Sequence, residues 1–133
     1  MTPRNVEIVR EMYDRREGGD MYVGESVHPE IVFIRIGSEL PDVAGEWHGK
    51  EGLRQATAEY LNVFEDYRFE VEKIIDLGGR VLVLERHSAR GKLSGASISQ
   101  DVGTLLTLRD GKIVRWEYYW ERAEALEAAG VKE

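Results

Sequence analysis

Residues Thr104–Trp120 read TLLTLRDGKIVRWEYYW, and they carry the clearest fold signal in the chain. Two runs of strand-forming residues flank Asp110–Gly111, a dipeptide that favours a tight hairpin turn because the turn needs positive φ. In the second run, Trp116, Tyr118 and Trp120 are spaced two residues apart, so their side chains share one face of the strand. We expect this aromatic face to line a core or a pocket.

The rest of the chain predicts helices before this hairpin and further strands leading into it. Helical spacing of apolar residues and β-branched runs distinguish the two types of element. Consecutive strands joined by short turns pair antiparallel, so a meander is expected. The predicted elements are helices at 3–17, 20–27 (stopped by His28–Pro29), 49–64 and 121–129 (stopped by Gly130), a strand at 31–36, a short extended piece at 46–49, and strands at 67–76, 80–90, 97–108 and 112–120.

Composition narrows the class of protein. A chain of 133 residues predicts a single domain, residues 1–133, and no apolar run approaches the length of a membrane span. The N-terminus lacks the apolar stretch of a signal peptide, so we expect a cytoplasmic protein. There are no cysteines, and the formal net charge of −7 argues against a nucleic-acid partner, because binding to phosphates requires a basic face.

The strand predicted at 80–90 is apolar on both faces at its start. Val81 and Val83 point to one side, and Leu82 and Leu84 point to the other. Helices cover one face of such a sheet, which leaves the other face for a partner. We therefore expect a homodimer through the outer sheet face; the alternative is that the C-terminal helix folds back over it.

Four short phrases occur in order along the chain: Tyr13 followed by Gly19–Asp20, His28–Glu30, Gly49–Leu53 and Leu108–Ile113. With the order of elements, they resemble the SnoaL-like branch of the nuclear transport factor 2-like superfamily over nearly the whole chain. The resemblance implies an α+β fold in which a cone-shaped, curved antiparallel sheet wraps the N-terminal helices around an apolar pocket, with a short C-terminal helix. It does not imply one reaction, because isomerases, cyclases, dehydratases and binding domains share this fold.

The resemblance also implies where acids would lie in an isomerase or a cyclase. These relatives use buried carboxylates to move a proton next to a carbonyl group. The corresponding places fall near Arg35 and, seven residues before Gly111, at Thr104, and neither residue is an acid. This departure weakens the expectation of either reaction.

Glu85 and His87 are the best substitute for the missing acids. They lie two residues apart on one predicted strand and therefore share a face, and a histidine beside a carboxylate can act as an acid or a base. Asp101 is on the expected neighbouring strand and could reach them. The alternative is a ladder of polar residues on the solvent face.

Arg35 follows four apolar residues and could stabilise negative charge on a bound carbonyl compound, or it could pair with a surface acid. Aromatic side chains on several elements could form the pocket wall, although core packing explains them as well. The candidate wall residues are Tyr13, Phe33, Trp47, Tyr60, Phe64, Trp116, Tyr118 and Trp120.

The sequence thus predicts a protein that binds a small, mostly apolar organic molecule in the cone. If it is an enzyme, we expect cofactor-free proton transfer such as isomerisation, cyclisation or dehydration, with His87 as acid/base, Glu85 orienting it and Arg35 or Tyr60 polarising a carbonyl. The alternative is a non-catalytic ligand-binding or dimerisation module. The three histidines lie on separate elements, so no metal site is predicted, and no cofactor motif is present.

Overall fold

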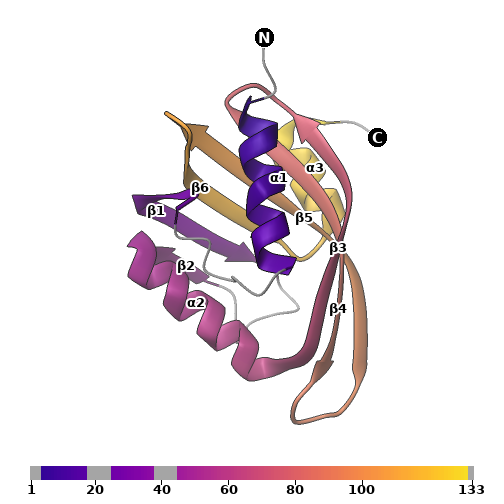
Figure 1. Cartoon of the computed structure of the whole chain (residues 1–133). Helices are drawn as coiled ribbons and strands as arrows, with labels where there is room; N and C mark the ends of the chain where they lie inside the picture. The colour runs from indigo at the N-terminus through magenta and orange to yellow at the C-terminus, as the bar shows by residue number, and fades with distance from the viewer. Residues whose placement is uncertain (1–3, 18–24, 38–44, 132–133) are drawn as a thin grey trace.

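The computed structural model describes residues 4–17, 25–37 and 45–131, which form three helices and one six-stranded sheet (Figure 1). The sheet is strongly curved, with α1 and α2 on its concave face and α3 on the opposite face. In chain order the elements are α1 (Arg4–Glu17), β1 (Val27–Ile36), β2 (Gly45–His48), α2 (Gly49–Val63), β3 (Phe64–Asp76), β4 (Arg80–Gly91), β5 (Ser97–Arg109), β6 (Lys112–Tyr119) and α3 (Arg122–Ala129).

The order of the strands across the sheet is β2-β1-β6-β5-β4-β3. Neighbouring strands are antiparallel except β1 and β6, which are parallel, so the sheet is mixed rather than wholly antiparallel. The parallel pair arises because β1 comes from the start of the chain and adds to the edge of the β3–β6 meander. The expected α+β cone with a short C-terminal helix is confirmed.

The hairpin between β5 and β6 turns at Asp110 and Gly111, whose φ angles of 51° and 77° are both positive. The predicted turn chemistry is confirmed. The helix expected at 20–27 does not extend to residue 27, because residues 25–26 form a turn and His28–Pro29 lie within β1. Residues 20–24 are outside the described residues. Proline is accommodated because the pairing of β1 with β6 is irregular between Val27 and Val32, where a missing N–H breaks no ladder bond.

Two apolar clusters lie on the two faces of the sheet. The inner cluster packs α1 and α2 against the concave face and includes Val81 and Val83. The outer cluster joins Leu82, Leu84 and β6 to α3. The C-terminal helix therefore covers the apolar patch that suggested a partner subunit, and a homodimer through the outer face stays a prediction.

Gly103 sets how closely α3 approaches the sheet. A Cβ at this position would overlap the Cβ of Ala125 on α3. We expect Gly103→Val to lower the free energy of unfolding by about 1–3 kcal/mol, because the added side chain forces the helix off the sheet. Urea unfolding checks this, with Gly79→Ala as the control, since no heavy atom lies within 4 Å of a Cβ there. Equal midpoints for the two variants would contradict the close packing of α3.

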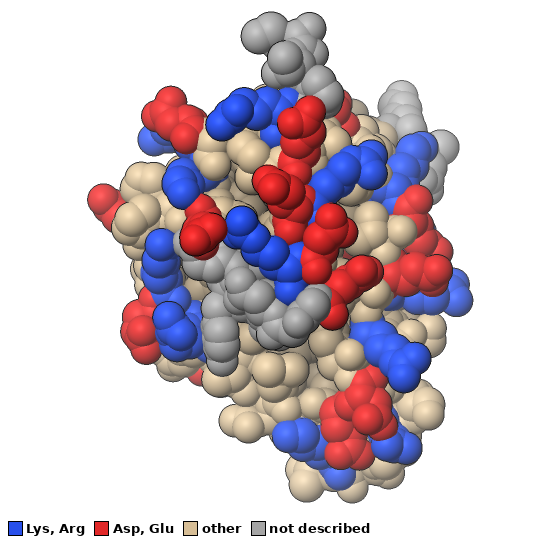
Figure 2. All heavy atoms as spheres, viewed as in Figure 1, with Lys and Arg blue, Asp and Glu red and all other residues tan. Residues whose placement is uncertain are grey.

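On the face shown in Figure 2, basic and acidic side chains are intermingled rather than gathered into a patch of one sign. This agrees with the acidic net charge in giving no extended basic face on that side. In the described part of the chain, no helix has both the length and the apolar character that crossing a membrane requires.

Candidate functional site

A cavity opens on the concave side of the sheet between α1, α2, β1, β3 and β6. About 40 Å³ of it is open to the centres of water-sized molecules, and all empty space between its walls, including its open mouth, is about 470 Å³. This space has room for a few water molecules or for one polar head group. The lining residues are Arg16, Phe33, Arg35, Leu53, Thr57, Tyr60, Leu61, Tyr67, Trp116 and Tyr118.

Two arginines bring positive charge to this inner cavity. Arg35 is only 5% exposed, and its Nη2 donates a hydrogen bond to the backbone oxygen of Ala56 at 3.2 Å. Its Cζ lies 4.5 Å from the centre of the Tyr60 ring, within cation–π distance. Arg16 comes from the last turn of α1, and its Nη2 lies 3.4 Å from the Tyr67 hydroxyl. Burial lowers the pKa of Arg35.

Tyr60 links the cavity to His87, which lies behind it. The Tyr60 hydroxyl is 2.9 Å from Nε2 and 3.1 Å from Nδ1 of His87, so it can donate to whichever nitrogen is unprotonated. His87 is 0% exposed and is flanked by the rings of Phe64, Tyr67 and Trp120. Tyr60 therefore lines the cavity, and its hydroxyl bonds to a partner that is shielded from water.

Glu85 has a separate set of partners. The hydroxyls of Tyr13 and Thr104 donate to its Oε2 at 2.8 and 2.6 Å. Thr104 reaches it diagonally across β4 and β5, because Thr104 pairs with Val83, two residues from Glu85. Glu85 is 2% exposed and does not line the inner cavity.

Burial controls the protonation of both titratable groups. It lowers the pKa of His87 to about 4, so the imidazole is neutral at pH 7. It raises the pKa of Glu85, although Arg16 and the hydroxyls of Thr104 and Tyr13 act in the opposite direction. Burial also raises the pKa of the Tyr60 hydroxyl, which keeps its proton.

The structure brings Glu85, His87 and Arg35 to the concave side, but not Asp101. The register pairs Asp101 with Arg86, which places it on the outer face with a side chain that is 47% exposed. The expectation that Asp101 would reach His87 is therefore wrong, because the long β4–β5 pairing puts Gln100 opposite His87 instead. Glu85 bonds to Tyr13 and Thr104 rather than to His87, so the orienting role expected for it has no support in these contacts.

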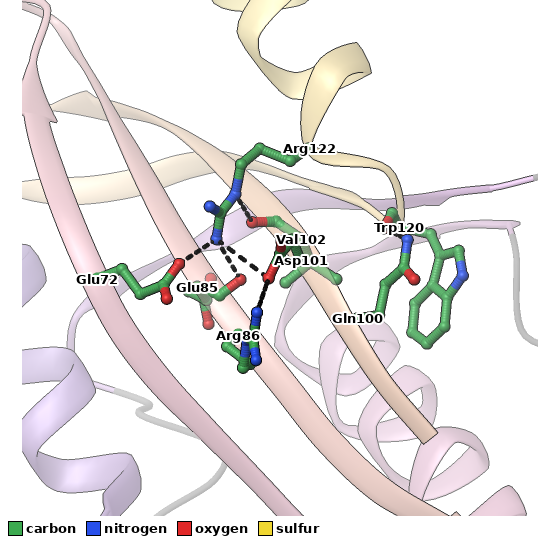
Figure 3. A network of polar contacts seen from close by, with 8 residues as sticks. All are labelled: Glu72, Glu85, Arg86, Gln100, Asp101, Val102, Trp120 and Arg122. Carbon is green, nitrogen blue, oxygen red and sulfur yellow. Dashed lines mark hydrogen bonds and ion pairs between the residues drawn. The ribbon is translucent and has the colours of Figure 1, made fainter. Parts of the chain in front are cut away.

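On the outer face, Asp101 belongs to a network centred on Arg122 at the start of α3 (Figure 3). Nη2 of Arg122 donates to Glu72 at 2.6 Å and to the backbone oxygen of Glu85 at 2.8 Å, and it lies 4.0 Å from Asp101. These bonds attach α3 to the back of the strand whose front carries Glu85. The network is structural support for the sheet and contributes no side chain to the cavity.

The predicted aromatic wall is only partly a cavity wall. Of the predicted residues, Phe33, Tyr60, Trp116 and Tyr118 line the cavity, while Tyr13, Trp47, Phe64 and Trp120 pack behind or beside them. Trp116, Tyr118 and Trp120 all belong to the inner cluster, so the shared face of this strand is confirmed.

Arg16 and Tyr67 were missed by the sequence reasoning. Arg16 continues the helical spacing of Val6, Val9 and Tyr13, the buried stripe of α1, so a charge placed on an apolar face was the available signal. Tyr67 begins an alternation with Phe69 and Val71 along β3, and all three pack against the inner cluster.

Within residues 4–17, 25–37 and 45–131, no three histidine, cysteine, aspartate or glutamate side chains gather to hold a metal ion. His48 pairs with Glu46 at 2.8 Å, and Nδ1 of His28 accepts a bond from the backbone N–H of Glu30 at 3.0 Å.

Residues 9–116 match the sequence profile of the SnoaL-like domain. The chain belongs to the SnoaL-like domain family. Among proteins with curated functions, none matches this SnoaL-like domain.

Solved structures with the same fold cover almost the whole chain. A nuclear transport factor 2-like protein of unknown function from Burkholderia pseudomallei is 19% identical with a TM-score of 0.81, over 95% of this chain and 97% of its own. A protein from Jannaschia, described as a putative SnoaL-like polyketide cyclase, is 21% identical with a TM-score of 0.78. The match covers 100% of this chain and 98% of that protein. TerC, crystallised with polyporic acid, is 22% identical with a TM-score of 0.78, over 96% and 98%. At these identities the likeness shows a shared fold.

In this SnoaL-like domain, the two places where an acid was expected from the family resemblance have other roles. Arg35 lines the cavity, and Thr104 donates to Glu85 on the neighbouring strand. The buried carboxyl group is thus present, but β4 carries it, and it lies behind the cavity wall.

Proposed function

We propose that the inner cavity binds a small, mostly apolar carbonyl compound and that the protein catalyses cofactor-free proton transfer on it. The observation that carries the proposal is the buried pair of Tyr60 and His87, because Tyr60 lines the cavity and the imidazole bonded to its hydroxyl is neutral and shielded from water. Proton transfer by a positioned hydroxyl and imidazole is a common source of catalysis next to carbonyl groups.

The proposed chemistry has one proton relay and one site for negative charge. Tyr60 takes the proton from a carbon beside the ligand carbonyl while its own hydroxyl proton passes to His87. The electrons of the broken C–H bond then reside on the carbonyl oxygen as an enolate, which the guanidinium of Arg35 stabilises. The reverse relay returns the proton to the same or another carbon, which gives exchange or isomerisation.

Cyclisation and dehydration begin with the same enolate, so the geometry supports the class of proton transfer rather than one product. The TerC complex with polyporic acid supports the idea that this fold accommodates an organic molecule. In this proposal Tyr60 contacts the ligand, and His87 exchanges protons with Tyr60 rather than with the ligand.

The proposal is tested by proton exchange in D₂O. Acetophenone, 1-tetralone and 2-tetralone are incubated with the protein, and loss of the NMR signals beside the carbonyl is followed against a buffer blank. We expect exchange faster than the blank for at least one ketone. Ketones that bind without accelerated exchange would contradict catalysis, and ketones that neither bind nor exchange would contradict the whole proposal.

The second candidate is a non-catalytic ligand-binding module. It is favoured by one observation: neither Glu85 nor His87 lines the inner cavity. This candidate predicts that a molecule retained through purification is recovered chemically unchanged after denaturation and mass spectrometry.

A further inference from the structure

Arg16 is half-buried, and it lacks the nearby acid that usually accompanies a desolvated arginine. In the described part of the chain, no carboxylate oxygen lies within 4.0 Å of its guanidinium nitrogens, and its Nε is a buried donor with no hydrogen-bond partner. Buried charges are ordinarily paired, and a buried donor without a partner is unfavourable. The position therefore has an unused capacity to bind an acceptor.

Aromatic rings hold this guanidinium in place. The Cζ of Arg16 lies 4.8 Å from the centre of the Phe69 ring, 5.4 Å from that of Tyr13 and 5.5 Å from that of Trp116. Cation–π contacts support a charge without neutralising it. The rings therefore do not cancel the positive charge of Arg16, which can also attract a group that enters the inner cavity.

Arg35 enters the same cavity from β1 and is supported in the same way. Its Cζ lies 5.2 Å from the centre of Phe33 and 5.3 Å from that of Trp47, in addition to Tyr60. Both arginines line the cavity, and among the described residues none that lines it is acidic. Glu85, a buried acid, accepts bonds from two hydroxyls and interacts electrostatically with Arg16, but it forms no ion pair with Arg16 within 4.0 Å.

The lining hydroxyls add further donors. Tyr67 and Tyr118 line the cavity together with Tyr60. Guanidinium groups can only donate hydrogen bonds, so the ligand must supply the acceptors. The roughly 40 Å³ that is open to the centres of water-sized molecules suits a group of two oxygens, while the aromatic walls suit a flat apolar body at the open mouth.

We infer that Arg16 and Arg35 form a binding site for the anionic oxygens of a planar, conjugated acid, either a carboxylate or an ionised enol. This inference rests on the proposed function for the location of the ligand, and it deepens that function by assigning the ligand a negative charge in the ground state. Neither arginine needs to take part in proton transfer for it to hold.

The test compares three small probes of similar size by calorimetry at pH 7: benzoate, ionised 1,3-cyclohexanedione and neutral acetophenone. We expect at least one of the two anions to bind about 10-fold more tightly than acetophenone, since a hydrogen bond to a charged group is worth that factor or more. Preference for benzoate assigns a carboxylate, and preference for the dione assigns an ionised enol. Acetophenone binding as tightly as both anions, or no anion binding at millimolar concentration, would overturn the inference.

Variants place the effect on the two arginines. Arg16→Met and Arg35→Met should each lower the affinity for the preferred anion about 10-fold. They should change the affinity for acetophenone less than about threefold. Arg10→Met is the matched control, because Arg10 lies on the exposed side of the same helix as Arg16. An unchanged anion preference in both cavity variants would overturn the inference.

Thermal unfolding separates anion binding from a structural role. Whatever the Tm of the ligand-free Met variants, they should lose the rise in Tm that the anion causes in the parent, because only binding to the folded state produces that rise. If Arg16→Met fails to fold, Arg16→Lys replaces it in the test. Lysine keeps the charge but lacks Nε and the planar guanidinium, so this variant should still bind the anion with lower affinity. Unaltered anion affinity in Arg16→Lys would then count against the assignment.

The outcomes also distinguish this inference from the proposed function. If the protein prefers anions but does not accelerate ketone exchange, the anion site is supported and the proposed catalysis is wrong. If the protein accelerates exchange but binds acetophenone and the anions equally well, the proposed catalysis is supported and the anion site is wrong.

Discussion

Replacing Tyr60 by phenylalanine is expected to slow the catalysed exchange of ketone protons by about 10²–10⁴-fold, the range of a positioned acid or base. The substitution removes one oxygen, and the ring that packs against Phe64 and Arg35 stays. Ligand affinity should therefore change much less than the rate. The measurement is the NMR exchange assay, with binding followed separately by calorimetry.

Tyr119→Phe is the control for this substitution. Tyr119 lies on the outer face of the sheet, and its hydroxyl donates to Glu117 at 3.0 Å, so it should leave exchange unchanged. His87→Ala should abolish exchange while the protein stays folded. Combining it with Tyr60→Phe should slow exchange little more than either single substitution, because the two residues act as one unit. Exchange at the parent rate in Tyr60→Phe would remove the relay from the proposal.

Acidification between pH 6.5 and pH 4 is expected to destabilise the protein by about 3 kcal/mol through His87 alone. The pKa of this group falls from 6.5 to about 4 on folding because of burial. Within this window the unfolded chain binds a proton that the folded chain does not, so the stability present above pH 6.5 is lost as the pH falls toward 4. Urea unfolding at several pH values measures the slope.

His87→Gln should flatten this dependence, because its side chain does not titrate. The control is His48→Gln: His48 is 67% exposed, so this variant should keep the parent slope. Glu85 acts in the opposite sense, since its raised pKa gives stability that is present at low pH and lost as the pH rises through its folded-state pKa. The difference between the parent and His87→Gln isolates the histidine. Identical slopes for these two proteins would show that His87 is not the group responsible.

Much of the fold could be predicted from local patterns. The positive φ angles needed at Asp110–Gly111 located a hairpin, and the alternation of Trp116, Tyr118 and Trp120 identified its inner face. Gly130 ends α3 in the left-handed conformation with φ of 73°. These features depend on the conformations available to a few neighbouring residues, so the sequence carries them directly.

The pairing of strands distant in the sequence could not be read in the same way. The position of Asp101 depended on the register of β4 against β5, and a shift of one residue exchanges the two faces of a strand. The sequence showed that both faces of β4 are apolar at its start, but it left open which face lies outside and whether α3 or a partner covers that face.

The sequence by itself determined most of the elements, the α+β class, and the apolar faces of the helices and strands, because these follow from residue spacing and turn chemistry. Only the tertiary structure decided which polar groups meet. Tyr13 joins Glu85, Tyr60 joins His87, and Arg16 faces the inner cavity without a carboxylate beside it in the described residues. The physical reason is that hydrogen bonds and charges act over a few ångströms, and folding brings together groups that are 27 to 72 residues apart in the chain.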